Sequence, residues 1–138
     1  MTFDITPATS RDIAALAAIV EETGLFPPEM LPDLLASPDA QWRAARQDGA
    51  LLGFAFAALE AMTDTAWNLR ALGVRSSARR QGAALALLAE VEAALAGLGA
   101  RVLVIDTADG EGFAPARALY LGAGYAEQPA IPAFWSAD

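Results

Sequence analysis

Residues 67–98 read WNLRALGVRSSARRQGAALALLAEVEAALAGL, and the rest of the chain is organised around this stretch. An apolar run from Leu69 to Val74 predicts a strand. Apolar residues then recur at helical spacing and predict one face of a long helix: Leu85, Leu88, Val91, Leu95 and Leu98. The segment between them, Arg79-Arg80-Gln81-Gly82-Ala83-Ala84, is therefore expected to be the turn through which the strand enters the helix.

This turn has the chemistry of an anion site. A helix N-terminus exposes backbone N–H groups and the positive end of the macrodipole, so Arg79 and Arg80 are unfavourable there unless an anion binds. Gly82 permits a close approach of the backbone, and the small Ala84 keeps the surface clear. We therefore expect N–H groups from about Gln81 to Leu85 to bind a phosphate or diphosphate.

The charge distribution favours a small anion over a long one. The net charge of −8 argues against a nucleic-acid partner, because nucleic-acid binding depends on neutralising phosphates. Four of the nine basic residues nevertheless fall within residues 70–80, and no acidic residue lies between Asp64 and Glu90. This pattern indicates a small polyanionic ligand. The alternative is an arginine cluster that pairs with carboxylates from elsewhere in the chain.

Composition narrows the chemistry further. The chain has 138 residues, as expected of one domain, and contains neither cysteine nor histidine. This absence excludes thiolate nucleophiles, imidazole bases, Ser-His-Asp triads and zinc sites made of cysteine or histidine. We therefore predict no metal. The longest apolar run, Ala50 to Leu59, is half the length of a membrane span, and no signal peptide is recognised. We expect a soluble, cytoplasmic protein without a membrane partner.

The remaining elements predict a mixed α/β fold. A short strand over residues 3–8 precedes a helix capped by Thr9-Ser10 and Asp12, and a second short helix covers residues 29–35. Asp48-Gly49 predicts a type I′ hairpin between strands 41–47 and 51–59. Strand 66–74 should run parallel to strand 101–106, because a helix connects them. A helix over residues 114–121 and a final strand from Tyr125 complete the order.

Two motifs together carry a resemblance to a known family. Arg79-x-x-Gly82-x-Ala84 lies about 35 residues ahead of Ala-Arg-Ala-Leu-Tyr-x-x-x-Gly-Tyr, residues 116–125. This pair, with the order of elements, resembles the GNAT superfamily of acetyl-CoA-dependent N-acyltransferases over nearly the whole chain. The resemblance implies one domain, residues 1–138, with a central mixed and mostly antiparallel sheet. It also implies two N-terminal helices, a central coenzyme-binding helix and a short C-terminal helix.

The resemblance also implies site residues. The coenzyme A pyrophosphate would bind residues of the turn: Arg79, Arg80, Gln81, Gly82, Ala83 and Ala84. The pantetheine arm would lie where the strand ending Leu72-Gly73-Val74 splays from strand 101–106, and a backbone N–H near Val74 would polarise the thioester carbonyl. Tyr120 would act as general acid toward the departing thiolate, because a phenol keeps its proton at neutral pH. Phe26 would line the acceptor pocket.

Three positions depart from the family pattern. Many relatives carry a general-base glutamate where this chain has Arg70, with Asn68 two residues earlier. Glu60 is the first candidate for the missing base, Asp64 the second, and an ordered water chain is an alternative. Phe113 replaces an asparagine that contacts pantetheine. Only thirteen residues follow Tyr125, so either the chain is shortened or another protomer completes the sheet edge in a homodimer.

The predicted function is transfer of an acetyl group from acetyl-CoA to a primary amine of a small molecule or peptide, by direct attack in a ternary complex. The absence of cysteine is consistent with this route, because no acyl-enzyme on sulfur can form. A coenzyme A or acyl-CoA-binding module of the same fold with little or no turnover is an alternative. A nucleotide-phosphate binder is a weaker third reading, because the chain lacks the lysine of a Walker motif.

Overall fold

The computed structural model describes residues 3–106 and 114–128. These residues belong to two compact units, one that ends at Ile105 and one that begins at Asp106, and each is described by itself. The predictions for Phe113, for the loop glycines Gly110 and Gly112, and for residues 131–138 fall outside the described residues. No helix in the described ranges is long and apolar enough to cross a membrane.

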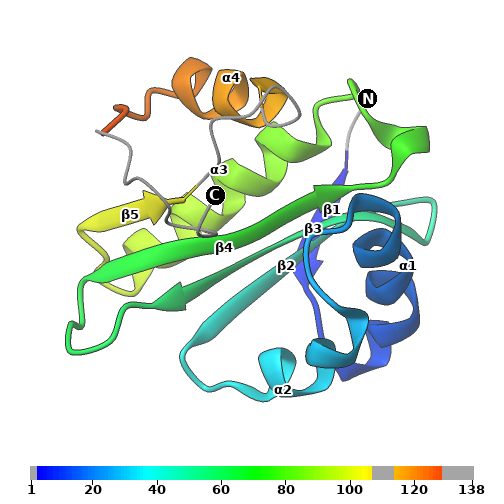
Figure 1. The fold of residues 1–138 in the computed structure, drawn as a ribbon, viewed down its shortest axis with the longest axis horizontal. Coiled ribbons are helices and arrows are strands. Elements are labelled where there is room, and N and C mark those ends of the chain that lie inside the picture. Colours follow the sequence, from blue (N-terminus) through cyan, green and yellow to red (C-terminus); the bar gives the residue numbers. More distant parts are fainter. Residues whose placement is uncertain (1–2, 107–113, 129–138) are drawn as a thin grey trace, which may run out of the picture. The chain divides into compact units, whose positions relative to one another are not determined.

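The first unit is built on a five-stranded mixed sheet (Figure 1). Its strands follow the order of the chain: β1 Asp4–Pro7, β2 Ala40–Gln47, β3 Ala50–Leu59, β4 Ala66–Val74 and β5 Val102–Ile105. The first three pairings are antiparallel, and β4 pairs with β5 in parallel. Asp48 and Gly49 both have positive φ, 52° and 82°, as a type I′ turn requires. The predicted fold class is confirmed.

Helices cover both faces of this sheet (Figure 1). One face carries the short η1 Ser10–Asp12 and α1 Ile13–Thr23, followed by η2 Pro28–Met30 and α2 Leu31–Ala36. The other face carries α3 Ala83–Gly97. Large and small side chains alternate along β3, and successive side chains of a strand point to opposite faces of the sheet. This alternation determines which face each helix covers. Phe54 and Phe56 face α1 and α2, while small Ala55 and Ala57 let α3 approach closely.

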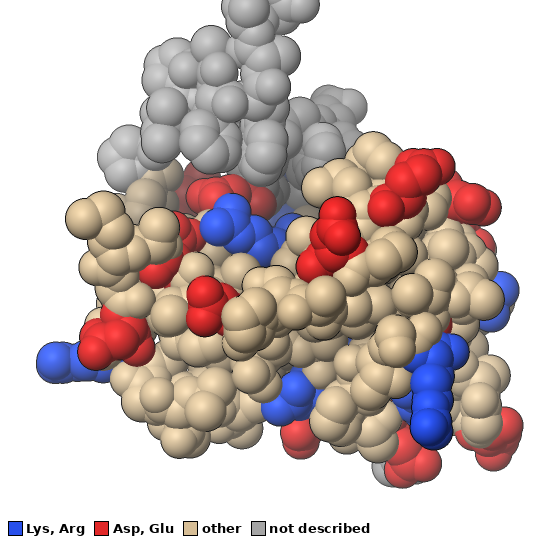
Figure 2. Space-filling view, turned by 90° about the horizontal axis from the view of Figure 1, so that it is seen from below, with Lys and Arg blue, Asp and Glu red and all other residues tan. Residues whose placement is uncertain are grey.

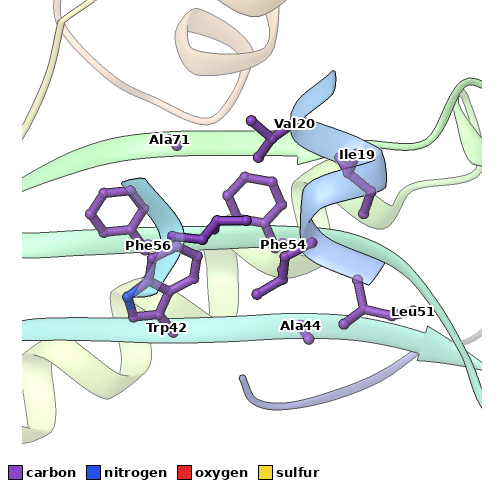
Figure 3. Packing of buried hydrophobic residues seen from close by; sticks show 10 residues of the cluster. Ile19, Val20, Trp42, Ala44, Leu51, Phe54, Phe56 and Ala71 are labelled. Atoms are coloured by element: carbon purple, nitrogen blue, oxygen red, sulfur yellow. The ribbon is translucent and has the colours of Figure 1, made fainter. Parts of the chain in front are cut away.

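Aromatic side chains form the centre of the core beneath α1 and α2 (Figure 3). The Trp42 ring stacks on Phe56, with ring centroids 4.3 Å apart, and on Phe54 at 5.7 Å. Trp42 Nε1 donates a hydrogen bond to the Leu34 carbonyl at 3.3 Å, so the buried indole nitrogen is satisfied at the end of α2. Gly73 allows close packing over this core, because a Cβ there would lie 2.9 Å from Leu25 Cδ1.

The buried face of α3 differs slightly from the prediction. Leu88, Val91 and Leu95 are buried as expected, but Leu85 and Leu98 are 52% and 54% exposed. Ala83 and Leu87 take their place against the sheet. Leu98 is the C-cap residue, one position beyond the end of α3, and Leu85 lies in the first turn of the helix beside the buried Ala83.

The second unit contains α4, Ala114–Gly122, as predicted from residues 114–121. Its end is closed by a hydrogen bond from the Tyr125 N–H to the Tyr120 carbonyl at 3.0 Å. The two tyrosine rings meet edge to face, with centroids 6.2 Å apart. Residues 125–128 are not in a strand, so the predicted final strand does not begin at Tyr125; its remaining residues lie outside the described part of the chain.

Candidate active site

The turn between β4 and α3 presents a run of unpaired backbone donors. Arg80 and Gly82 both have positive φ, 65° and 86°, and these two left-handed residues curl the chain into the first turn of α3. Among the described residues, no acceptor is bonded to the N–H groups from Arg80 to Leu85, and the first bond beyond them joins the Ala86 N–H to the Gly82 carbonyl. A run of unpaired N–H groups at a helix N-terminus has the donor geometry that can bind an anion.

Gly82 is required in this turn for its conformation. A Cβ built there would meet no atom within 4 Å, so the space in front of it is open. The left-handed φ is the constraint, because it costs other L-residues roughly 1–2 kcal/mol. The exposed Arg79 and Arg80 side chains flank the opening, and Arg79 Nε is turned back to the Val74 carbonyl at 3.4 Å.

A strand edge leads directly into this turn. Pairing between β4 and β5 ends at Leu69 and Ile105, so residues 70–74 have no strand partner on that side among the described residues. The Arg75 N–H donates to the Leu52 carbonyl of β3 at 2.8 Å. Because N–H directions alternate along a strand, those of Leu72 and Val74 point the other way, toward the unpaired edge. This edge can hold an extended ligand and offers two donors to a carbonyl.

Glu22, at the end of α1, is a member of this site that the sequence analysis missed. Its carboxylate accepts a hydrogen bond from the Ser76 N–H and thereby holds the start of the turn. This hydrogen bond lowers the pKa of the Glu22 carboxyl, and Arg79 and Arg75 lower it further. No local signal could have revealed the contact, because the two partners are 54 residues apart in the chain.

The predicted base Glu60 contacts Arg70, which occupies the position of the missing glutamate, and Asn68, two residues before it. Glu60 follows the last residue of β3, and its Oε1 accepts a hydrogen bond from Asn68 Nδ2 at 2.9 Å. Arg70 Nη2 lies 3.7 Å from the same oxygen. A bulge in β4 brings Arg70 there, since Ala57 pairs with Leu69 while Phe56 pairs with Ala71. Asp64 is exposed in the β3–β4 turn.

A cavity of about 350 Å³ opens next to Arg70 on the face that carries α1 and α2. Its wall on the side of the helices is apolar and contains Leu25 and Phe26 of the α1–η2 connection, Met30 of η2 and Leu34 of α2. Its floor comes from the sheet, where Phe56 and Ala58 lie beside the Arg70 side chain. Phe26, predicted as an acceptor contact, thus lines a cavity, and its ring packs edge-on against Phe54 and Phe56.

Tyr120 belongs to the second unit, on the last turn of α4. Burial raises the pKa of its phenol above the ordinary value of 10.0, so the hydroxyl keeps its proton at neutral pH. Within residues 3–106 and 114–128 no cluster of acidic side chains could hold a metal ion.

Comparison with known proteins agrees with this geometry. The family model described as "Acetyltransferase (GNAT) family" matches residues 13–125. The chain therefore belongs to the GNAT acetyltransferase family and is an acyltransferase. No curated protein matches the sequence.

Solved structures share the fold over nearly the whole chain. A protein from Desulfovibrio desulfuricans assigned to the GNAT family is 25% identical, with a TM-score of 0.87 over 99% of this chain and 92% of that one. The aminoglycoside acetyltransferase AAC(6')-Iy, solved with a coenzyme A bisubstrate analogue, is 20% identical, with a TM-score of 0.78 over 95% of each chain. A ribosomal-protein-alanine N-acetyltransferase from Brucella melitensis is 23% identical, with a TM-score of 0.77 over 94% of this chain and 96% of that one.

Proposed function

We propose that the protein transfers an acetyl group from acetyl-CoA to a primary amine by direct attack in a ternary complex. The observation that carries the proposal is that two features follow each other along the chain. Among the described residues, the edge of β4 at residues 70–74 has no strand partner, and the short η3, Ser76–Ala78, connects it to the N–H groups from Arg80 to Leu85, which have no bonded acceptor. An acyl-CoA has the matching shape, with an extended pantetheine arm that ends in a pyrophosphate.

The residues of the turn fit the pyrophosphate by charge and by donor geometry. The Arg80–Leu85 N–H groups and the α3 macrodipole favour an anion, and the Arg79 and Arg80 side chains add positive charge at the rim. Gln81 contributes an amide whose Nε2 contacts the Ser77 carbonyl at 3.5 Å. Ala83 and Ala84 keep side-chain bulk away from the bound phosphates.

The chemistry requires a polarised carbonyl, a neutral amine and an acid. The N–H groups of Leu72 and Val74 would donate to the thioester oxygen as negative charge develops there. The amine nitrogen attacks the carbonyl carbon, a C–N bond forms and the C–S bond breaks. Tyr120 then gives its proton to the departing thiolate, and the phenolate recovers a proton from solvent.

Glu60 is the proposed base that takes the proton lost by the amine, directly or through a water molecule. Its carboxylate is held by Asn68 and lies beside Arg70, which lines the cavity. Such a position is close to an amine bound in the cavity and is reached by solvent, since the Glu60 side chain is 34% exposed. We prefer Glu60 to Asp64 because the Glu60 carboxylate contacts Asn68 and Arg70, and Arg70 lines the cavity.

We also propose that the two compact units act as one acetyltransferase domain. The matched family region, residues 13–125, includes α1 of the first unit and α4 of the second. In the proposed reaction, the turn before α3 of the first unit would bind the coenzyme, and Tyr120 on α4 of the second unit would act as the general acid.

Ligand-dependent thermal unfolding tests the proposal. A ligand that binds the folded state raises the melting temperature, so acetyl-CoA and coenzyme A should each raise it by several degrees, and ATP should raise it less. Release of free thiol with a panel of amines should then show turnover. The absence of any shift with either coenzyme would refute the proposal. A shift without thiol release from any amine would favour the coenzyme-binding module.

A further inference from the structure

The cavity beside Arg70 has an unusual combination of walls for an amine-binding site. Seven of the nine residues that line it are apolar, and the two polar ones are Ser37 and Arg70. None of the described lining residues carries a carboxylate, but the Glu60 carboxylate lies 3.7 Å from the guanidinium of Arg70, which does line the cavity. We infer, on the basis of the function proposed above, that the acceptor is a small apolar α-amino acid with a free carboxylate.

Arg70 is available to a ligand carboxylate. Its side chain is 46% exposed, and its guanidinium donates no hydrogen bond within the described residues. The contact with Glu60 is 3.7 Å long, beyond hydrogen-bonding distance, and an exposed pair of this kind contributes at most about 1 kcal/mol. A ligand carboxylate can form two parallel hydrogen bonds with the guanidinium, which are stronger than this loose contact.

Glu60 and Arg70 together match the charges of a zwitterion. An α-amino acid carries its carboxylate and its ammonium on the same carbon, and Arg70 Nη2 and Glu60 Oε1 are 3.7 Å apart. With the carboxylate on Arg70, the ammonium is directed to Glu60, the proposed base. The amino-acid side chain then enters the wall formed by Leu25, Phe26, Met30 and Leu34.

The size of the cavity and the sign of its charge argue against other amines. A volume of about 350 Å³ is near the lower limit for ligand pockets, which favours a single amino acid over a larger molecule. A polycation would bring several ammonium groups close to Arg70 without a lining carboxylate to receive them. A peptide N-terminus lacks the adjacent carboxylate. Figure 2 shows acidic and basic side chains interspersed with uncharged surface, without one continuous acidic field on the face drawn.

The experiment compares matched acceptors with saturating acetyl-CoA. Leucine, phenylalanine and methionine are tested against their amides, which retain the amine and side chain but lack the carboxylate. Glycine, a leucine-initiated peptide and an aminoglycoside complete the panel. We expect kcat/KM for leucine to exceed that for leucinamide by about tenfold or more, since a charge-assisted bidentate pair is lost. With coenzyme A bound, leucine but not leucinamide should raise the melting temperature further.

Variants at Arg70 test the role of its guanidinium. Arg70→Met should remove the preference for leucine over leucinamide, and Arg70→Lys should restore part of it, because lysine keeps the charge but not the two-pronged geometry. Arg101→Met, which removes an exposed arginine at the start of β5, should keep the full preference. The comparison of leucine with leucinamide in the unmodified protein does not depend on any variant folding.

The outcomes of this experiment test the acceptor class separately from the proposed acetyl transfer. Equal or better transfer to leucinamide, the peptide or the aminoglycoside would overturn the acceptor class and leave the proposed acetyl transfer in place. Thermal stabilisation by leucine without thiol release would support the pocket assignment and refute turnover. No stabilisation and no acetylation of any apolar amino acid would overturn the inference.

Discussion

Tyr120 carries the only phenol among the proposed catalytic groups, and burial raises its pKa. A raised pKa keeps the hydroxyl protonated at neutral pH, where it can serve as an acid. Tyr120→Phe removes the proton but keeps the ring that meets Tyr125. We expect kcat to fall about 10²-fold, the lower end of the range for a general acid, with little change in the acetyl-CoA-induced melting shift. Steady-state kinetics and thermal unfolding measure both, and an unaltered kcat would exclude this role.

Glu60 is tested by a substitution that keeps its hydrogen bond. In Glu60→Gln the amide oxygen still accepts from Asn68 Nδ2, but the side chain cannot take a proton. We expect kcat to fall about 10²-fold while coenzyme binding is retained. Asp64→Asn is the matched control, because Asp64 is exposed in the adjacent turn. If Asp64→Asn lowers kcat and Glu60→Gln does not, the base assignment must move to Asp64.

At the scale of elements, the turn between β4 and α3 can be probed at Gly82. Gly82→Glu places a negative side chain in the open space where we expect the pyrophosphate. Coenzyme A should no longer raise the melting temperature. Because glutamate is strained at the positive φ of this position, the substitution should also lower the free energy of unfolding by roughly 1–2 kcal/mol.

Gly99 offers a control for this strain. It has the same φ of 86° and the same open space, but it follows the C-terminus of α3. Gly99→Glu should show a similar loss of stability and a normal response to coenzyme A. A normal response in Gly82→Glu as well would place the anion site elsewhere.

The connection between η1 and the sheet depends on Asp12. Burial alone would raise its pKa, but hydrogen bonds from Arg46 and the Thr9 N–H outweigh that effect, and the pKa is lowered. Arg46 Nη2 lies 3.0 Å from Asp12 Oδ2, and Asp12 is the second member of a capping box with Thr9. We therefore expect Asp12→Asn to lower the free energy of unfolding at pH 7 by about 1–2 kcal/mol.

The pH dependence of this effect follows from the direction of the pKa shift. A carboxyl whose pKa is lowered by folding stabilises the folded state above its unfolded pKa, near 3.9, and loses that effect as the pH falls through the folded pKa. The difference in the free energy of unfolding between the Asp12→Asn variant and the parent protein should thus become smaller below about pH 4. Denaturant unfolding at pH 7 and pH 3 measures it, and a difference independent of pH would contradict the ionic explanation.

At the scale of the whole molecule, the proposal requires both compact units to respond to one ligand. If acetyl-CoA contacts α3 and Tyr120 on α4 together, saturating acetyl-CoA should slow amide hydrogen exchange in both helices. Exchange measured by mass spectrometry on peptides that cover Ala83–Gly97 and Ala114–Gly122 tests this. Protection of α3 alone would show that the second unit does not take part in coenzyme binding.

Most of the fold could be predicted from local patterns. The apolar run of β4, the spacing of Leu88, Val91 and Leu95, and the Asp48-Gly49 turn are signals that act within a few residues. The β4–β5 pairing also followed, because the handedness of a strand–helix–strand connection leaves few alternatives. The exposure of Leu85 and Leu98 could not be predicted in this way. Periodicity shows which face of a helix is apolar, but it does not show how far along the helix the sheet covers that face.

The β4–α3 turn and the order of the elements around it could be predicted from the sequence, because dihedral preferences and hydrophobic periodicity are properties of neighbouring residues. Which distant side chains meet is a property of the folded chain. The bulge at Arg70 turns its guanidinium toward Glu60 and the cavity, and Glu22 holds Ser76 across 54 residues. Such contacts depend on strand register and on how helices pack across a sheet, and no stretch of the chain carries that information alone.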